Sequence, residues 1–173
     1  MGLDTTIYRS VKETCHDTKT GQVVEYYGMN NEIVYFRKNY CLMEWLEKRW
    51  NLTMENCESY LIYPEDILAL REDTRKCLQI INGNRGTMYT TKNTIRKDIV
   101  NKIKEIFPNN NWNSHDYNWN DATQKIEPKI HTFNEKDADD IQSINDFVES
   151  ITSHYSDEEF LNQQNVFLIN SNW

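Results

Sequence analysis

The sequence lacks the features that would mark it as a membrane, secreted or metal-binding protein. No run approaches the ~20 apolar residues that a membrane-spanning helix needs. No apolar stretch follows the N-terminus, so we expect no secretory signal. The four cysteines include no CxxC pair, which argues against a zinc site or a disulfide framework. We therefore expect reduced thiols in a cytoplasmic protein with no metal and no cofactor.

The charge balance excludes a further class of function. The 27 acidic residues outnumber the 19 basic ones, and the formal net charge is -8. General nucleic-acid binding is not expected, because it needs clustered Lys and Arg. The charges are unevenly placed: residues 83–107 hold six basic and two acidic residues, whereas residues 132–160 hold nine acidic residues and one lysine. The second region predicts an acidic surface that suits a protein partner.

Hydrophobic periodicity predicts an α+β fold, with a small, mainly antiparallel sheet packed against three or more helices. We expect strands over residues 3–11, 22–27, 59–63 and 87–91, and an edge strand in the C-terminal VFLINSNW. The first two strands are expected to pair as a hairpin. Helices are expected over residues 31–50, 64–83, 93–107 and 134–155, and a capping box at Ser156-x-x-Glu159 opens a last short helix.

The organisation predicted from these elements is a single α+β domain over residues 1–173. Within it, residues 109–122 (NNNWNSHDYNWNDA) form a long loop rich in asparagine and aromatic residues. Loops of that length tend to be functional or disordered. Residues 132–173 form an acidic, helical C-terminal extension.

The first candidate site lies in residues 32–46, EIVYFRKNYCLMEWL. If the helix begins near Tyr35, Arg37 and Lys38 lie in its first turn, where free N–H groups favour an anion. Arginine adds a planar fork suited to phosphate or carboxylate, and the ring of Tyr35 can stack on a base. The alternative is that Lys38 is solvated and Arg37 pairs with a carboxylate such as Glu32.

Two further segments carry candidate binding residues. The glycine-bracketed loop GNRG at residues 83–86, with Arg85, either exposes N–H groups to a phosphate or forms a helix C-cap and turn, and the second interpretation is favoured. In the 109–122 loop, Trp112, Tyr117 and Trp119 can hold a base, a sugar or a peptide, or they fold back on the core.

Catalysis has no motif to support it. The sequence has no HExxH, GxSxG or paired metal-ligand motif, and Ser114-His115-Asp116 are adjacent and so cannot form a triad. We assign no catalytic residue and expect a binding protein rather than an enzyme.

The N-terminal MGLDTTIYR and the segment EIVYFRKNYCLMEWL resemble a family of small uncharacterised bacteriophage and prophage proteins. That family opens MGLDMYLYR and carries a segment like EVAYWRKANAIHKWF. The positions that match in the second segment are Glu32, Tyr35, Arg37, Lys38 and Trp45. Met43 stands where the family has histidine, so an acid–base role there is not implied. The resemblance covers roughly the first 80 residues and implies a phage origin, hence the host cytoplasm, but no chemistry.

Taken together, these residues predict a phage accessory protein of the anti-defence type. We expect it to bind and sequester an anionic small molecule, such as a nucleotide immune signal, through Tyr35, Arg37, Lys38, Arg85 and the aromatic loop. The alternatives are an acidic inhibitor of a host protein and a hydrolase of a nucleotide signal. The sequence leaves the oligomeric state open, homo-oligomers included.

Overall fold

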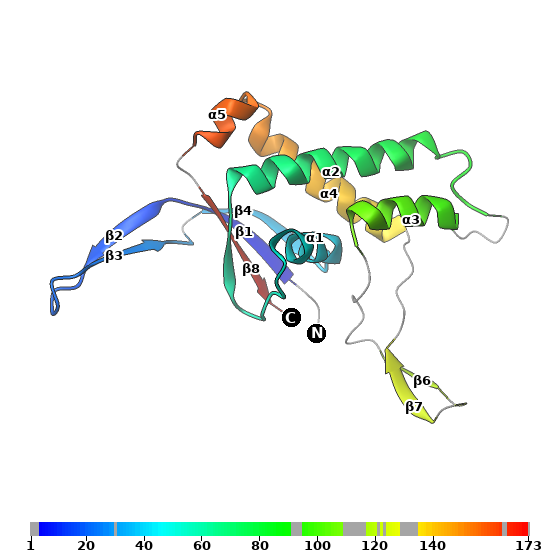
Figure 1. The fold of residues 1–173 in the computed structure, drawn as a ribbon, viewed down its shortest axis with the longest axis horizontal. Helices are drawn as coiled ribbons and strands as arrows, with labels where there is room; N and C mark the ends of the chain where they lie inside the picture. Colours follow the sequence, from blue (N-terminus) through cyan, green and yellow to red (C-terminus); the bar gives the residue numbers. More distant parts are fainter. Residues whose placement is uncertain are drawn as a thin grey trace. The chain divides into compact units, whose positions relative to one another are not determined.

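A computed structural model describes residues 4–29, 31–90, 95–108, 117–120, 122, 124–128, 135–163 and 166–172. These residues form an α+β fold, which confirms the predicted class (Figure 1). The strands are β1 (Asp4–Ser10), β2 (Lys12–His16), β3 (Val23–Tyr27), β4 (Asn31–Arg37), β5 (Ser59–Ile62), β6 (Tyr117–Asn120), β7 (Lys125–Pro128) and β8 (Val166–Asn172). The helices are α1 (Tyr40–Trp50), α2 (Pro64–Gly83), α3 (Lys97–Ile106), α4 (Glu135–Thr152) and α5 (Asp157–Leu161). None of the helices in the described residues is long and apolar enough to span a bilayer.

The chain divides into two compact units, where the sequence predicted a single domain. Unit 1 combines Met1–Asn39, Thr53–Glu72 and Ile144–Trp173, and unit 2 combines Tyr40–Leu52 and Asp73–Ser143. Each unit is therefore assembled from segments that are far apart in the sequence. The two are described separately below.

Unit 1 contains a four-stranded antiparallel sheet, called sheet A, with strand order β4-β1-β8-β5. The predicted edge strand at the C-terminus is wrong, because β8 lies between β1 and β5. The reason is its run of four apolar residues, Val166–Ile169, all of which are buried. A continuous apolar run is typical of a strand that is buried on both faces. The segment 132–173 is therefore not only a helical extension, since it supplies a central strand of the sheet.

One face of sheet A, called the inner face, packs against the helices of unit 1. The Phe36 ring of β4 meets Phe147 of α4 edge to face, with ring centroids 6.0 Å apart. The Phe167 ring of β8 stacks on Phe160 of α5 at 6.4 Å. Between them Ile7 and Ile169 lie opposite each other in the β1–β8 register and are fully buried. Burying each such side chain contributes about 1.5–3 kcal/mol.

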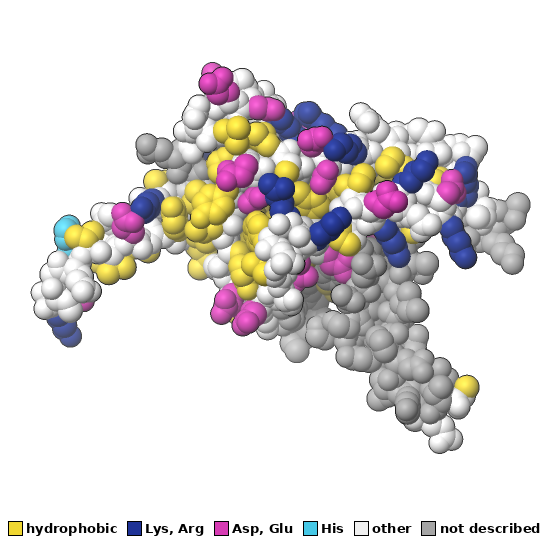
Figure 2. Space-filling model, in the orientation of Figure 1, with side chains coloured by type: hydrophobic (Ala, Val, Ile, Leu, Met, Phe, Trp, Pro, Cys, Tyr) yellow, Lys and Arg dark blue, Asp and Glu magenta, His cyan; other side chains and the backbone are white. Residues whose placement is uncertain are grey.

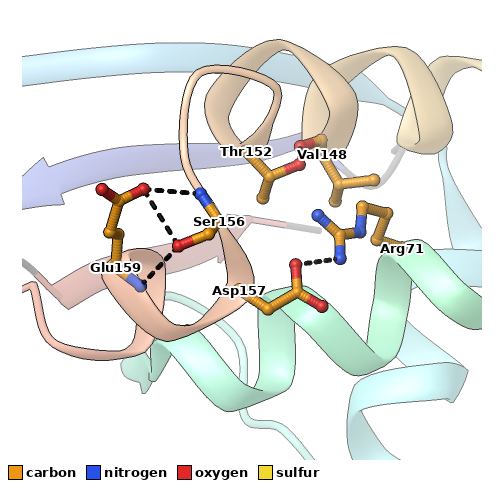
Figure 3. A network of polar contacts seen from close by, with 6 residues as sticks. All are labelled: Arg71, Val148, Thr152, Ser156, Asp157 and Glu159. Atoms are coloured by element: carbon orange, nitrogen blue, oxygen red, sulfur yellow. Dashed lines mark hydrogen bonds and ion pairs between the residues drawn. The ribbon is translucent and has the colours of Figure 1, made fainter.

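The last short helix is held by polar contacts that Figure 3 shows from close by. The predicted capping box is confirmed: the Ser156 hydroxyl accepts from the Glu159 N–H at 3.2 Å, and the Glu159 carboxylate accepts from the Ser156 N–H at 2.7 Å. The Arg71 guanidinium of α2 donates to Asp157, the first residue of α5, at 2.6 Å. These contacts fix α5 where Phe160 can reach the inner face of sheet A.

The hairpin predicted from the first two expected strands is wrong. A strand absent from the prediction, β2, pairs with β3 in a separate two-stranded sheet, called the ribbon, and β1 pairs with β4 and β8 instead. The ribbon depends on its turn. Gly21, with φ +68°, donates to the Asp17 carbonyl, and the Asp17 carboxylate accepts from the N–H groups of Lys19 and Thr20. KETCH has little apolar content, so its strand follows from turn chemistry rather than from periodicity.

The helix expected over residues 31–50 is also wrong in its first part. Residues Asn31–Arg37 form β4, and α1 begins only at Tyr40. The β-branched Ile33 and Val34 favour the extended backbone. Lys38 then adopts a left-handed conformation (φ 54°), which separates strand from helix. The apolar spacing that suggested one helical stripe joins residues of two different elements.

Unit 2 contains α1, α3, β6 and β7, the C-terminal part of α2 and the N-terminal part of α4. The Trp45 ring of α1 lies 6.5 Å from Phe107, and its indole N–H donates to Asp73 of α2 at 2.9 Å. The Lys48 ammonium donates to the Glu105 carbonyl at 2.7 Å, where a cation suits the C-terminus of α3. The strand expected over residues 87–91 is reduced, among described residues, to an isolated bridge between Tyr89 and Ile95.

Candidate binding face on sheet A

The register of sheet A places the first candidate residues on the face opposite the helices of unit 1, called the outer face. Residues directly opposite one another on antiparallel strands share a face, and alternate residues along a strand return to it. Phe36 lies on the inner face, so Tyr35 and Arg37 lie on the outer one. The outer face has three rows: Arg37, Asp4 and Asn172; Tyr35, Thr6, Asn170 and Ser59; and Glu32, Tyr8, Leu168 and Leu61.

Arg37 and Lys38 do not occupy the first turn of a helix, so the predicted helix N-terminus is not part of this site. Arg37 is the last residue of β4, and Lys38 is the left-handed residue after it. Both side chains are exposed. Among the described residues, the Arg37 guanidinium makes no hydrogen bond or ion pair, so Glu32 is not its partner there. Its fork remains available to a ligand.

Tyr35 is bound to the neighbouring strand. Its side chain is 50% exposed, and its hydroxyl hydrogen-bonds the Asp4 carboxylate of β1. That hydrogen bond is the main reason that the pKa of Tyr35 is raised above its ordinary value, because it favours the neutral phenol; desolvation and the charge of Asp4 act in the same direction. The ring is therefore held on the outer face, next to Arg37 on the same strand.

Two side-chain amides of β8 lie in the first two rows: Asn172 in the row of Arg37 and Asn170 in the row of Tyr35. The Asn170 side-chain N–H₂ donates to the Ser59 hydroxyl at 3.0 Å and to the carbonyls of Cys57 and Glu58 at 3.4 Å. The Cys57 thiol donates to the Asn172 side-chain oxygen at 2.8 Å. These bonds orient both amides before any ligand arrives. A preorganised polar row loses less conformational entropy on binding than a mobile one.

The third row is apolar from β1 to β5 and ends at the exposed Glu32 of β4. Tyr8 and Leu61 are half-buried, and Leu168 between them is 6% exposed. The Met29 thioether lies 3.8 Å from the Ser59 hydroxyl, and the Met29 side chain is 54% exposed. Figure 2 shows hydrophobic side chains gathered over the strands of sheet A. The outer face thus changes from a cation, through amides and hydroxyls, to an apolar surface within three rows.

The remaining predicted site residues belong to unit 2. Arg85 is exposed in the turn after α2. The N–H groups of Asn84, Arg85 and Thr87 donate to the carbonyls of Ile81, Asn82 and Asn84. They are engaged in a helix end and turn, so the phosphate-binding interpretation of GNRG is not supported by this backbone.

The aromatic loop falls largely outside the described residues. Trp112 lies outside them, as does Ser114-His115-Asp116. Tyr117 and Trp119 form part of β6, which pairs with β7 so that Tyr117 is opposite Pro128 and Trp119 opposite Ile126. Part of the expected loop is therefore a strand, and the side chains of β6 are not among those described.

Several carboxylates of the acidic segment 132–160 have partners within their own unit. In unit 2 Glu135 accepts from the Tyr89 hydroxyl at 2.5 Å, and Asp140 pairs with Lys136 at 2.6 Å. In unit 1 Asp157 pairs with Arg71, and Glu159 completes the capping box. The acidic segment therefore contributes residues to both units.

The four cysteines are free thiols, two of them exposed and two buried. Cys15 and Cys57 are exposed, while burial raises the pKa of the Cys77 thiol to about 12 and also raises that of Cys41. The described residues contain no group of three or more His, Cys, Asp or Glu side chains that could hold a metal ion.

Comparisons with known proteins found no relative: no protein-family model, no curated protein and no solved structure matches the chain. Function is therefore argued from the residues of the outer face. The sequence pointed to Tyr35 and Arg37, but it missed Thr6, Tyr8 and Asn170. They come from β1 and β8, and only the strand register brings them beside β4.

Proposed function

We propose that the protein binds a small anionic molecule with an aromatic ring, such as a nucleotide, on the outer face of sheet A. The observation that supports this most is the exposed Arg37, which has no partner among the described residues and lies beside the ring of Tyr35. A guanidinium fork matches phosphate or carboxylate oxygens and forms charge-assisted hydrogen bonds with them.

The other rows supply the rest of such a site. Thr6 and the preoriented Asn170 offer hydrogen bonds to a sugar, and the half-buried Tyr8 with Leu61 offers an apolar surface for a base. Successive rows on one face are ~7 Å apart, since a strand rises about 3.4 Å per residue. The arginine and Tyr8 rows are then ~13 Å apart, a span that suits a nucleotide with more than one phosphate.

The proposed role is sequestration rather than turnover. In the phage setting that the sequence resemblance implies, the protein would withhold a nucleotide immune signal of the host. Incubation with each nucleotide followed by mass spectrometry separates the two roles, because a sequestering protein returns its ligand unchanged and a hydrolase does not.

Isothermal titration against a panel of mono-, di- and cyclic nucleotides tests the proposal. We expect heat of binding with at least one of them. Arg37→Ala should weaken it by roughly 10- to 100-fold, because a hydrogen bond to a charged group contributes about 1.5–3 kcal/mol.

The matched control is Lys19→Ala, which removes an exposed cation from the ribbon turn of the same unit and should leave binding unchanged. Absence of heat with every nucleotide would refute the proposal. So would equal affinity in the Arg37 variant and the natural protein.

A further inference from the structure

The ribbon and the residues that flank it carry a large share of the exposed apolar side chains. Among the described residues, eleven large hydrophobic side chains are exposed, and five of them lie in residues 11–29: Val11, Val23, Val24, Tyr26 and Met29. Figures 1 and 2 show the ribbon and its hydrophobic side chains. A two-stranded ribbon is marginally stable in water on its own, and a third strand or more is needed for independent stability.

The turn of the ribbon fixes which backbone groups face outward. The Asp17 N–H donates to the Gln22 carbonyl at 2.9 Å, and the Gly21 N–H donates to the Asp17 carbonyl at 2.8 Å. The Asp17 N–H therefore faces β3, and along an antiparallel strand the backbone groups of every second residue face the same neighbour. It follows that Val24 and Tyr26 bond to β2, whereas the N–H and C=O groups of Val23, Glu25 and Tyr27 point away from it.

This outer edge of β3 has little of the usual protection against pairing, since its single charged residue, Glu25, is ion-paired with Lys12 of the same ribbon. No described strand pairs with it, and its sequence VVEYY contains no proline, lysine or register shift. Sheet edges are normally protected by charges, proline or bulges. By contrast, the β4 edge of sheet A carries a bulge and two charged residues, and the outer edge of the ribbon at β2 begins with Lys12-Glu13.

We propose that a second copy of this chain pairs with the β3 edge, antiparallel and with Val24 on the two-fold axis. Val23 then forms a hydrogen-bonded pair with Glu25 of the partner subunit, and Val24 lies opposite the partner's Val24. The pair between Val23 and Glu25 of the partner subunit uses backbone groups that the ribbon leaves outward, whereas the backbone of Val24 stays bonded to β2. The result is a four-stranded sheet in the order β2-β3-β3-β2.

Charge favours this register over its neighbour. Centring the pair on Glu25 would place two carboxylates directly opposite each other, which is destabilising. Centring it on Val24 places Glu25 opposite Val23 instead, and Glu25 keeps its ion pair with Lys12 of the same ribbon. The contact therefore places no like charges directly opposite each other.

Sedimentation velocity over a range of protein concentrations tests the proposal with two proline variants. Val23→Pro removes an outward N–H of β3 without removing a ribbon hydrogen bond, and should weaken dimerisation at least tenfold. Thr14→Pro is the matched control. Its N–H also points away from the ribbon, but on the β2 edge, so this variant should dimerise like the natural protein. Circular dichroism and thermal unfolding verify that both variants fold.

A cross-link locates the two-fold axis. Val24 and its symmetry mate form a non-hydrogen-bonded pair, whose Cα atoms lie ~4.5 Å apart, within the range of a disulfide. Val24→Cys in a Cys15→Ser background should oxidise to a covalent dimer, and Val23→Cys in the same background should not. A protein that stays monomeric at all concentrations would overturn the proposal, as would equal dimer loss in the two proline variants or equal cross-linking at both positions.

Discussion

Sheet A and the ribbon are both antiparallel sheets of unit 1, yet different interactions hold them. Sheet A buries Ile7 and Ile169 completely on its inner face. In the ribbon, Val23 and Val24 are more than half exposed, and local chemistry maintains the pairing: the left-handed Gly21, the Asp17 side-chain bonds and the Lys12–Glu25 ion pair. Burial of apolar side chains thus stabilises sheet A, whereas the geometry of the turn and local polar contacts stabilise the ribbon.

The largest expected effect comes from removing core volume in sheet A. Ile7→Ala should lower the free energy of unfolding by about 3–4 kcal/mol, because it removes buried methyl groups and leaves a cavity. In the monomer, at low protein concentration, Val24→Ala in the ribbon should change it by less than about 0.5 kcal/mol, as exposed positions usually do. Urea denaturation of the two variants measures the difference. Equal losses would mean that the ribbon is packed as tightly as the sheet.

A smaller effect is expected from the ribbon turn. Gly21→Ala should destabilise the ribbon locally by about 1 kcal/mol, because an alanine at φ +68° is strained. A Cβ at this position meets no atom within 4 Å, so the cost is conformational alone. Amide hydrogen exchange in β2 and β3 measures it.

The control for the turn is Gly86→Ala, where space is also open but φ is not positive. It should leave exchange in the ribbon unchanged. If Gly21→Ala also leaves it unchanged, the turn does not maintain the ribbon.

The smallest effect on stability is expected at Tyr35. Asp4→Asn should lower the pKa of Tyr35 toward its ordinary value of 10.0, because it weakens the main cause of the upward shift. Glu32→Gln should lower it less, since Glu32 contributes least. The hydrogen bond stabilises the fold fully below pH 10.0 and is lost as the pH rises through the raised pKa. Ultraviolet titration, with Tyr35→Phe subtracted, follows the ionisation; an unchanged pKa in the Asp4 variant would contradict the assignment.

Elements with strong local signals could be predicted from the sequence. Pro64 begins α2, Ser156 begins the capping box, and Gly83 ends α2 as expected. The start of α1 is not predictable because Phe36 of β4 falls by coincidence on the helical spacing of the apolar residues of α1, while the conformation of Lys38 leaves no sequence signal. Sequence periodicity does not predict β2, because contacts across the turn rather than an apolar pattern stabilise this strand.

The candidate site was predictable only along a single strand. Tyr35 and Arg37 are two residues apart, so their common face follows from strand periodicity once β4 is recognised. Asp4 and Asn170 are distant in the sequence from Tyr35 and Arg37, and a single sequence does not reveal how β1 and β8 align with β4. Strand register is a tertiary property, set by the packing of the inner face.

The position of β8 has a consequence for synthesis of the chain on the ribosome. Asp4 pairs with Asn172, so β1, which has β4 as one neighbour, gains its second neighbour only from residues made 168 positions later. Until then β5 cannot join sheet A, because its link to β1 runs through β8. Such long sequence separation slows folding and leaves apolar strands exposed to other chains in the meantime. We therefore expect the yield of folded protein to depend more on translation speed and chaperone availability than on the free energy of unfolding of the folded chain.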